Sequence, residues 1–246
     1  MRLTRIYVPG PVVAGQDIVL PAQAGEHLTR VLRLPPGTPF TLFNGAGGEF
    51  SAALGESTGK RVAARVLEHV AAERESSLQI TLLQGIARGE RMDLIVQKAT
   101  ELGVTRIVPV LAERSVVKLD ARQRERKREH WRLVAISACE QCGRNRVPEV
   151  DEPVSLGEAI AAIAQGDSRF LLAADGESSL VSSAQRNPRS PVALLIGPEG
   201  GLAETERAFA RAQGFHACHM GPRVMRTETA GLAALALLQS VLGDFR

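Results

Sequence analysis

Two short stretches of the sequence combine an apolar run, a glycine-proline break and the start of a helix-like segment. The first is LLIGPEGGLAETE at residues 194–206, and the second is MGPRVMRTETAGLAALALLQ at residues 220–239. Glycine has no Cβ and tolerates positive φ, so backbone groups at such a break can come close to a ligand. Either stretch alone could be a plain strand-to-helix turn. Because both follow an apolar strand, together they favour a binding site.

The first loop lacks the residues that bind phosphate. A P-loop needs Lys followed by Ser or Thr, and none follows Gly200 and Gly201. The dinucleotide pattern G-x-G-x-x-G is also absent from this loop. Glu199 would repel a phosphate, so the sequence predicts a neutral or cationic ligand near the loop.

Charged residues beside the second loop could carry chemistry. Arg226 could stabilise negative charge that develops in a reacting group. Glu228 could be a general base, or simply a first-turn carboxylate that complements the helix dipole, with Thr227 as the N-cap. Glu140 is a second candidate base, or an ordinary carboxylate on a helix surface. These alternatives stay open at the level of the sequence.

The order of elements indicates where these loops must lie. From residue 78 onward, apolar strands alternate with helices, which predicts an α/β domain. The runs RFLLAAD and PVALLI are typical of strands buried on both faces of a parallel sheet. Ligands of such sheets bind at the carboxyl ends of the strands, where both loops are expected.

The first 70 residues follow a different pattern. Short strand candidates alternate with glycine-rich turns, and EHLTRVLRL at residues 26–34 predicts one short helix. We expect a small β-rich unit, closed like a barrel to remove exposed edges. The polar stretch at residues 71–77 is the expected linker.

Composition restricts the function classes. The chain has 246 residues, a net charge of +3 and three cysteines. No segment has the apolar length of a membrane span, and the first residues lack the apolar core of a signal peptide. We therefore expect a cytoplasmic protein that does not associate with a membrane. Residues 122–132 hold six Lys or Arg against two Glu, which indicates either a solvated helix face or a polyanion partner.

The cysteines allow two interpretations. Cys139 and Cys142 have the C-x-x-C spacing, and Cys218, His216 or His219 could complete a zinc site. No second C-x-x-C pair supports that site, so free buried thiols are favoured and no metal is expected.

Several separated motifs resemble one family. The stretches LLIGPEGGL, GPRVMRTETA, QKATELGV, HLTRVLRL, GAGGEF and EQCGRNRVPEV resemble the ribosomal RNA small subunit methyltransferase E family. Its members are S-adenosylmethionine-dependent uridine N3-methyltransferases of the SPOUT, or α/β-knot, superfamily. The resemblance implies a PUA-like, RNA-binding β-barrel at residues 1–72. It also implies a trefoil-knotted parallel sheet with flanking helices at residues 73–246, a homodimer with active sites at the subunit interface, and 16S rRNA of the small ribosomal subunit as partner.

The resemblance also implies functions for particular residues. The S-adenosylmethionine contacts would be Leu172, Ile196, Gly197, Glu199, Gly200, Gly201, Met220, Gly221, Val224, Met225 and Thr227. Arg144 lies in the segment that resembles the family's substrate side, and together with the candidates Arg226 and Glu228 it is expected to be catalytic. The RNA-binding residues are expected to be Arg5, Arg30, Arg33, Arg88 and Lys98.

The sequence departs from the family pattern at three positions. Ala203 and Cys142 each replace a usual Ser, and Arg88 replaces a common Lys. Ala203 lacks the side-chain oxygen of an N-cap, and Arg88 changes donor geometry. Two other functions stay open: another SPOUT reaction such as ribose 2′-O-methylation, and a non-catalytic RNA-binding module.

Overall fold

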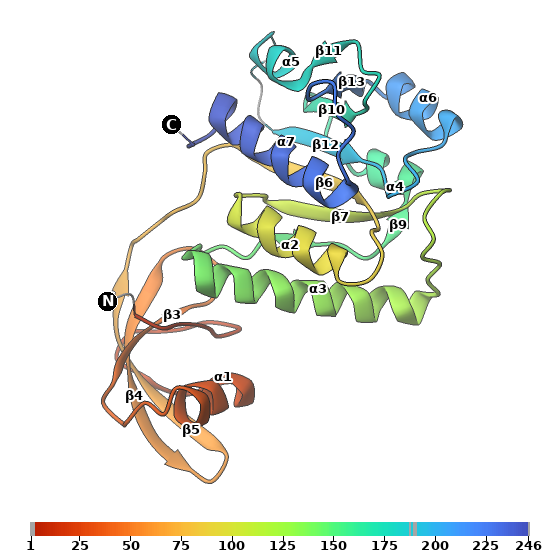
Figure 1. Ribbon diagram of the computed structural model, residues 1–246. Helices are drawn as coiled ribbons and strands as arrows, with labels where there is room; N and C mark the ends of the chain where they lie inside the picture. The colour runs from red at the N-terminus through yellow and green to blue at the C-terminus, as the bar shows by residue number, and fades with distance from the viewer. Residues whose placement is uncertain (1–2, 187, 189–190, 246) are drawn as a thin grey trace. The chain divides into compact units, whose positions relative to one another are not determined.

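The chain forms two compact units. The computed structural model describes residues 3–186, 188 and 191–245. The first unit comprises Met1–Glu75 and Cys139–Val147, and the second comprises Ser76–Ala138 and Pro148–Arg246 (Figure 1). The predicted division, 1–72 and 73–246, places residues 139–147 in the second domain, whereas they pack within the first unit. Among the described residues, no helix is long and apolar enough to cross a membrane.

The first unit contains a five-stranded sheet with the order β1-β3-β4-β5-β2. Its strands are β1 (Arg5–Tyr7), β2 (Asp17–Val19), β3 (Pro39–Phe43), β4 (Glu49–Thr58) and β5 (Arg61–Val70). Along β4, buried Phe50, Ala52 and Leu54 alternate with more exposed residues, as expected for a strand with one face in a core. The predicted PUA-like β unit is confirmed, and β1 and β2 are the two ends of its pairing order.

The expected helix at residues 26–34 begins and ends earlier than its pattern indicated. A short α-helix, α1 (Ala22–Glu26), continues into a π-helical turn, η1 (His27–Val31). The chain leaves this turn through Arg33, which has a φ of 53°, and the Leu34 N–H donates to the Leu28 carbonyl at 3.0 Å. Positive φ is uncommon for a residue with a Cβ, so the backbone at Arg33 is strained.

The expected linker is tied to a distant segment of the first unit. Glu75 accepts hydrogen bonds from the Arg144 guanidinium at 2.6 and 2.9 Å. The Asn145 side chain donates to the Ala72 carbonyl at 2.6 Å and accepts from Arg5 at the same distance. Arg144 and Asn145 are buried. The linker prediction missed these bonds because they join residues that are far apart in the sequence.

The second unit contains a larger sheet with the order β11-β13-β10-β12-β6-β7-β8, and β9 also pairs with β7. Its strands are β6 (Ile80–Gly85), β7 (Arg106–Leu111), β8 (Glu149–Val150), β9 (Val154–Ser155), β10 (Ser168–Leu172), β11 (Ser178–Ser179), β12 (Val192–Ile196) and β13 (His216–His219). Within the described residues, the strand pairs of this sheet are parallel. All five residues of β12 are buried, as the continuous apolar run predicted.

Helices flank this sheet. They are α2 (Arg91–Glu101), α3 (Ala121–Cys142), α4 (Leu156–Ala161), α5 (Leu180–Arg186), α6 (Glu204–Ala212) and α7 (Thr227–Leu242). Helix α7 packs against α2 and α5 (Figure 1). The α/β class is confirmed, and the trefoil knot stays a prediction about the path of the chain. The short elements α4, α5, β8, β9 and β11 were missed, because runs of two to seven residues carry little periodicity.

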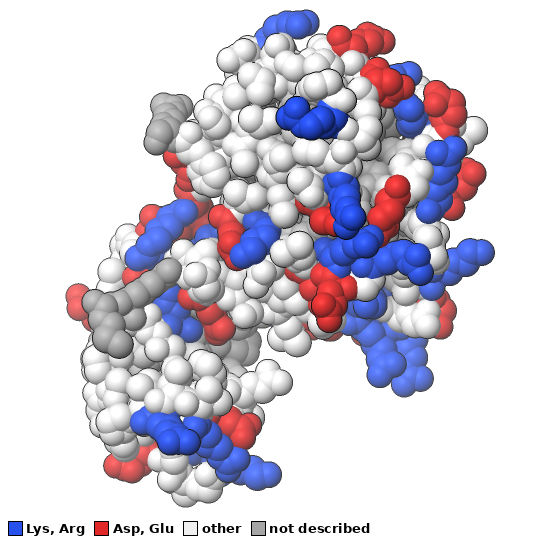
Figure 2. All heavy atoms as spheres, in the orientation of Figure 1, with Lys and Arg blue, Asp and Glu red and all other residues white. Residues whose placement is uncertain are grey.

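The basic run of residues 122–132 lies on α3 and is largely exposed. Arg128 pairs with Glu152 at 3.1 Å and with Glu129 at 3.3 Å. Trp131 is buried, and its indole N–H donates to Asp93 of α2 at 3.1 Å. On the face drawn in Figure 2, Lys and Arg occur in separate groups, most with Asp or Glu beside them.

The loop after β12 lies so close to Gly85 that the position leaves no room for a side chain. A Cβ built at Gly85 would lie 2.6 Å from Pro198 Cδ and 2.8 Å from the Gly197 carbonyl carbon. Gly85→Ala should therefore push the loop after β12 away and lower the free energy of unfolding by about 1–3 kcal/mol, the usual cost of overpacking. Urea denaturation measures this change.

The matched control is Gly157→Ala in α4, where an added Cβ meets nothing within 4 Å. That change should be neutral or stabilising by about 0.5–1 kcal/mol, because alanine favours the helix. Equal stability of the Gly85→Ala protein and the wild type would contradict the close approach.

Candidate cofactor and active site

The second unit has a cavity of about 860 Å³ at one edge of its sheet. The loops that follow β10, β12 and β13 line it, together with residues from the starts of α2 and α7. The predicted cofactor and catalytic residues that line it are Leu172, Ile196, Gly197, Glu199, Gly200, Gly201, Met220, Gly221, Val224, Met225, Arg226, Thr227 and Glu228.

The parallel register explains why these loops meet. Strand β10 lies between β12 and β13, with Leu171 opposite Leu195 and Leu172 opposite Cys218. The three strands therefore end at the same edge, which is where ligands of parallel sheets bind. The continuous apolar runs of β10 and β12 hold both strands inside the sheet, so the polar loops are the parts that reach the cavity.

The glycines of the first loop are required by its own turn. The Gly201 N–H donates to the Pro198 carbonyl at 2.8 Å, and Gly201 has a φ of 68°. A Cβ at Gly197 would lie 3.0 Å from the Leu202 nitrogen, and one at Gly200 would lie 3.1 Å from Arg114 Cβ. Glycine at these positions lets the loop fold tightly enough to expose backbone groups to the cavity.

A single hydroxyl joins the two loops. Thr227 Oγ1 donates to the Gly197 carbonyl at 2.6 Å and accepts from Gln84 Nε2 at 2.9 Å. The expectation that Thr227 is the N-cap of the last helix is wrong. Arg226 takes the N-cap position, with extended backbone and no side-chain cap, and Thr227 is the first helical residue. The sequence did not single out Gln84, which is fully buried on β6.

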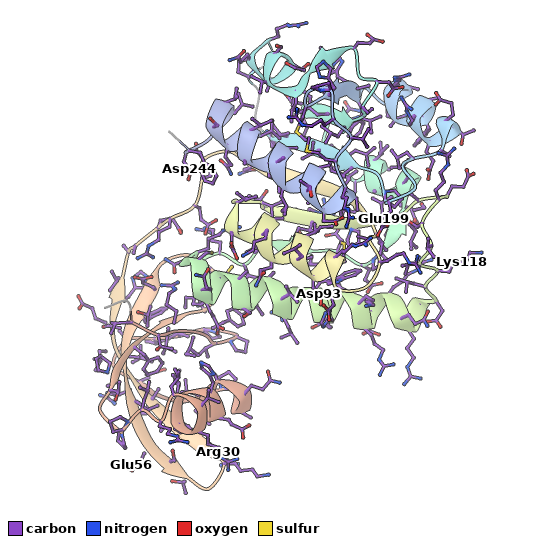
Figure 3. The ribbon with its side chains drawn as sticks, viewed as in Figure 1. Arg30, Glu56, Asp93, Lys118, Glu199 and Asp244 are labelled. Carbon is purple, nitrogen blue, oxygen red and sulfur yellow. The ribbon has the colours of Figure 1, made fainter. Side chains whose placement is uncertain are left out.

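Glu199 is held by the start of α2. Its Oε1 accepts from the Arg88 backbone N–H at 2.9 Å and from the Arg91 guanidinium at 3.0 Å (Figure 3). Burial alone would raise the pKa of Glu199, but these hydrogen bonds outweigh it and lower the pKa. The loop thus carries a carboxylate whose charge is largely balanced by Arg91, a residue that sequence reasoning missed.

Arg226 and Glu228 both line the cavity at the start of α7. Arg226 is exposed and lines the cavity. Glu228 is partly buried, and its Oε1 lies 3.8 Å from Arg91 Nε. Its Oε2 is buried, and none of the described residues offers it a hydrogen bond. A buried carboxylate oxygen without a partner is available to accept a proton or a hydrogen bond from a ligand.

Further charged residues of the cavity were not predicted. They are Arg91, Arg114, Asp175, Arg207 and Arg223. Arg207 of α6 lies 2.6 Å from both carboxylate oxygens of Asp175, which follows β10, and this hydrogen bond lowers the pKa of Asp175. The arginines are scattered over separate loops and helix starts, so no sequence motif gathers them.

Two candidate catalytic residues lie in the first unit. Arg144 is buried there, and its guanidinium is paired with Glu75 at 2.6 Å. Glu140 accepts a hydrogen bond from the Tyr7 backbone N–H at 2.9 Å, and burial raises the pKa of its carboxyl. Arg144 and Glu140 thus form hydrogen bonds within the first unit, whereas Arg226 and Glu228 both line the cavity of the second unit.

The predicted RNA-binding residues differ in exposure. Arg5 is buried against Glu49, Asn145 and the Phe43 ring, a placement that does not favour the predicted phosphate contact. Arg30 and Arg33 are exposed on the first unit, where Arg30 pairs with Glu26 at 2.9 Å (Figure 3). Arg88 is exposed beside the cavity, and Lys98 pairs with Glu101 on α2 at 2.8 Å.

The cysteines and Ala203 are further positions that the sequence singled out. All three cysteines are free, and burial raises the pKa of the Cys139 thiol to about 12. Within the described ranges, no group of three or more His, Cys, Asp or Glu is arranged to hold a metal.

Ala203 caps α6 without a side-chain bond, but Glu206 accepts from its backbone N–H at 2.9 Å and supplies half of a capping box.

Comparison with known proteins identifies the family. An RNA methyltransferase domain model matches residues 74–239, and an RNA methyltransferase PUA domain model matches residues 20–67. The chain belongs to the ribosomal RNA small subunit methyltransferase E family. It is 33% identical over 87% of its length to the family member of Bacillus subtilis, of which it covers 86%.

Two solved structures are similar over the whole of both chains. A methyltransferase from Legionella pneumophila, solved with bound S-adenosylmethionine, is 40% identical with a TM-score of 0.93. A ribosomal RNA small subunit methyltransferase E from Neisseria gonorrhoeae, bound to S-adenosylmethionine, is 37% identical with a TM-score of 0.92. The predicted family and α/β fold class are thereby confirmed.

The Thr227 hydroxyl offers a test of how the cavity is built. Thr227→Val keeps the shape of the side chain but leaves the Gly197 carbonyl and Gln84 Nε2 short of one partner. Each missing partner costs about 1–3 kcal/mol, and the loop after β12 should no longer keep its fixed place. We expect lower thermal stability and at least ten-fold weaker S-adenosylmethionine binding by calorimetry.

Thr229→Val is the matched control, because Thr229 is exposed on the same first turn of α7. It should change stability by less than about 0.5 kcal/mol. If both variants bind the cofactor as tightly as the wild type, the Thr227 hydroxyl does not organise the loops.

Proposed function

We propose that this protein transfers the methyl group of S-adenosylmethionine to N3 of a specific uridine in 16S rRNA of the small ribosomal subunit. The single observation that carries the proposal is the cavity that joins Arg226 and Glu228 to the glycine loops. Membership of the family supports the same substrate class.

The cavity suits S-adenosylmethionine. Ligand pockets usually measure about 300–1,000 Å³, and the volume here lies inside that range. The cofactor has no phosphate, which agrees with the absence of phosphate-binding motifs from the loop at residues 197–201. The predicted contacts around Gly197, Gly201, Met220 and Gly221 would hold its adenosine through backbone groups. When bound, the cofactor supplies a methyl group on a sulfonium sulfur.

The residues of the chain would perform the remaining chemistry. The uracil N3 proton must leave, and Glu228 Oε2 can accept it because none of the described residues occupies that oxygen. Negative charge then spreads over the uracil oxygens, where the exposed Arg226 can stabilise it. The cavity walls would align N3 with the methyl carbon, which is the positioning part of catalysis.

The first unit would bind RNA. Arg30 and Arg33 present exposed guanidinium groups on and just after the turn η1, and the strain at Arg33 is consistent with selection for its side chain. We also propose a cytoplasmic homodimer in which a second copy completes the active site. The partly exposed apolar residues Leu232, Leu237 and Val241 of α7 are consistent with such an interface.

The alternative activity is ribose 2′-O-methylation by the same cofactor. Mapping of the modified nucleotide separates the two activities. 16S rRNA from a strain lacking the gene is incubated with the protein, and the digested nucleosides are identified by mass spectrometry. We expect 3-methyluridine at one position, and a 2′-O-methylated nucleoside would instead assign the alternative.

Arg226→Ala should lower the single-turnover rate by about 100-fold or more, the scale seen when one oxyanion donor is removed. Arg226→Lys should rescue the rate only in part, because a point charge lacks the planar fork. Cofactor and RNA affinities should change much less. A full rate for Arg226→Ala at saturating cofactor and RNA would exclude catalysis by this residue.

Replacing Arg30 and Arg33 together by Gln should weaken RNA binding and make it less dependent on salt. The slope of log affinity against log salt should fall by about one unit for each phosphate that the variant no longer binds. Fluorescence anisotropy over a salt series measures the slope, and cofactor affinity should stay constant. Lys60→Gln on the β4–β5 turn is a control for the general removal of positive charge. Equal slopes for the double variant and the control would contradict RNA binding through the turn.

A further inference from the structure

Arg91 stands between the two carboxylates of the cavity. It is the first residue of α2, and its Nη1 donates to Glu199 Oε1 at 3.0 Å. On its other edge, Arg91 Nε lies 3.8 Å from Glu228 Oε1. The Arg91 guanidinium therefore pairs with Glu199 of the loop after β12 and with Glu228 of the first turn of α7.

The two oxygens of Glu228 are in different situations. Oε1 faces the Arg91 guanidinium, whereas Oε2 is buried without a hydrogen-bond partner among the described residues. Because Arg91 attracts Oε1, it limits rotation of the carboxylate and leaves Oε2 as the oxygen that can meet a ligand. The side chain of Glu228 is 13% exposed, so water competes little for this geometry.

Arg91 is the cation that pairs with Glu228, because other charged side chains of the cavity have different partners. The other charged side chains that line the cavity are Arg114, Asp175, Glu199, Arg207, Arg223 and Arg226. Arg207 is paired with Asp175, and Arg114 donates to the Gly200 carbonyl at 3.4 Å. In the described part of the chain, Arg91 is the one cation that forms an ion pair with Glu228.

We propose that Arg91 is a positioning residue that holds the Glu228 carboxylate in one orientation through Oε1 and leaves Oε2 for the substrate. This inference rests on the proposed function. The uracil N3 proton moves to Oε2, the N3 lone pair forms the bond to the methyl carbon, and the electrons of the carbon–sulfur bond return to sulfur.

The test is the single-turnover rate, measured at saturating cofactor and RNA. In Arg91→Gln, this rate should fall about ten-fold because the Glu228 carboxylate no longer has a fixed direction. Arg91→Lys should restore the rate in part, because a cation again faces Glu228 Oε1 but without the planar fork of Arg91.

Glu199→Gln is the matched control. It removes the bond between Arg91 and the loop after β12 but keeps the ion pair of Arg91 with Glu228. Cofactor affinity should fall in this variant, whereas the rate at saturating cofactor and RNA should fall much less than in Arg91→Gln. If Arg91 only braces the loop, Arg91→Gln and Glu199→Gln will weaken cofactor binding and lower the saturated rate to the same extent, which overturns the proposal.

The wild-type protein separates this inference from the function on which it rests. Wild-type protein that forms 3-methyluridine, together with a full saturated rate for Arg91→Gln, refutes positioning by Arg91 alone. Wild-type protein that forms no 3-methyluridine refutes the proposed function itself.

Discussion

The hydrogen bond from the Thr227 hydroxyl to the Gly197 carbonyl is the contact on which the cavity depends. It fixes the start of α7 against the loop after β12, and Gln84 completes the link to β6 in the middle of the sheet. Three segments that are far apart in sequence thus share one buried polar junction. Buried polar groups are costly unless they are hydrogen-bonded, so the two bonds of the Thr227 hydroxyl favour one arrangement of the loops over others.

Charge in the cavity is arranged around that junction. Arg91 and the Arg88 amide hold Glu199, and the same guanidinium approaches Glu228. Glu199, the residue that argued against a phosphate ligand in the sequence, is therefore part of an ion cluster with Arg91 and Glu228. The cavity presents arginines beside carboxylates, a combination that can accept a proton and stabilise an anion at one site.

The sequence predicted the elements that have strong local patterns. The apolar runs predicted β10 and β12, the glycine-proline breaks located the loops, and the spacing of Met92, Ile95, Val96 and Ala99 predicted α2 with its buried face. It did not predict Arg91, Arg207 or Gln84, because their importance comes from residues that are distant in the chain. The sequence predicted Thr227 as the N-cap of α7, whereas Thr227 is the first helical residue. Its hydroxyl bonds to Gly197 and Gln84 instead of capping the helix. The burial of Arg5 and Arg144 also escaped prediction, because a basic side chain is usually exposed.

The pairing of Glu75 with Arg144, 69 residues further along the chain, has a consequence for biosynthesis. A ribosome adds about 5–20 residues per second, so several seconds separate the emergence of the two partners. During that interval the five strands of the first unit are complete, but Arg5 and Glu75 lack their later bonds to residues 144 and 145. The N-terminal strands therefore reach their final packing only after α3 has left the ribosome, and most of the methyltransferase sheet is still unmade at that moment.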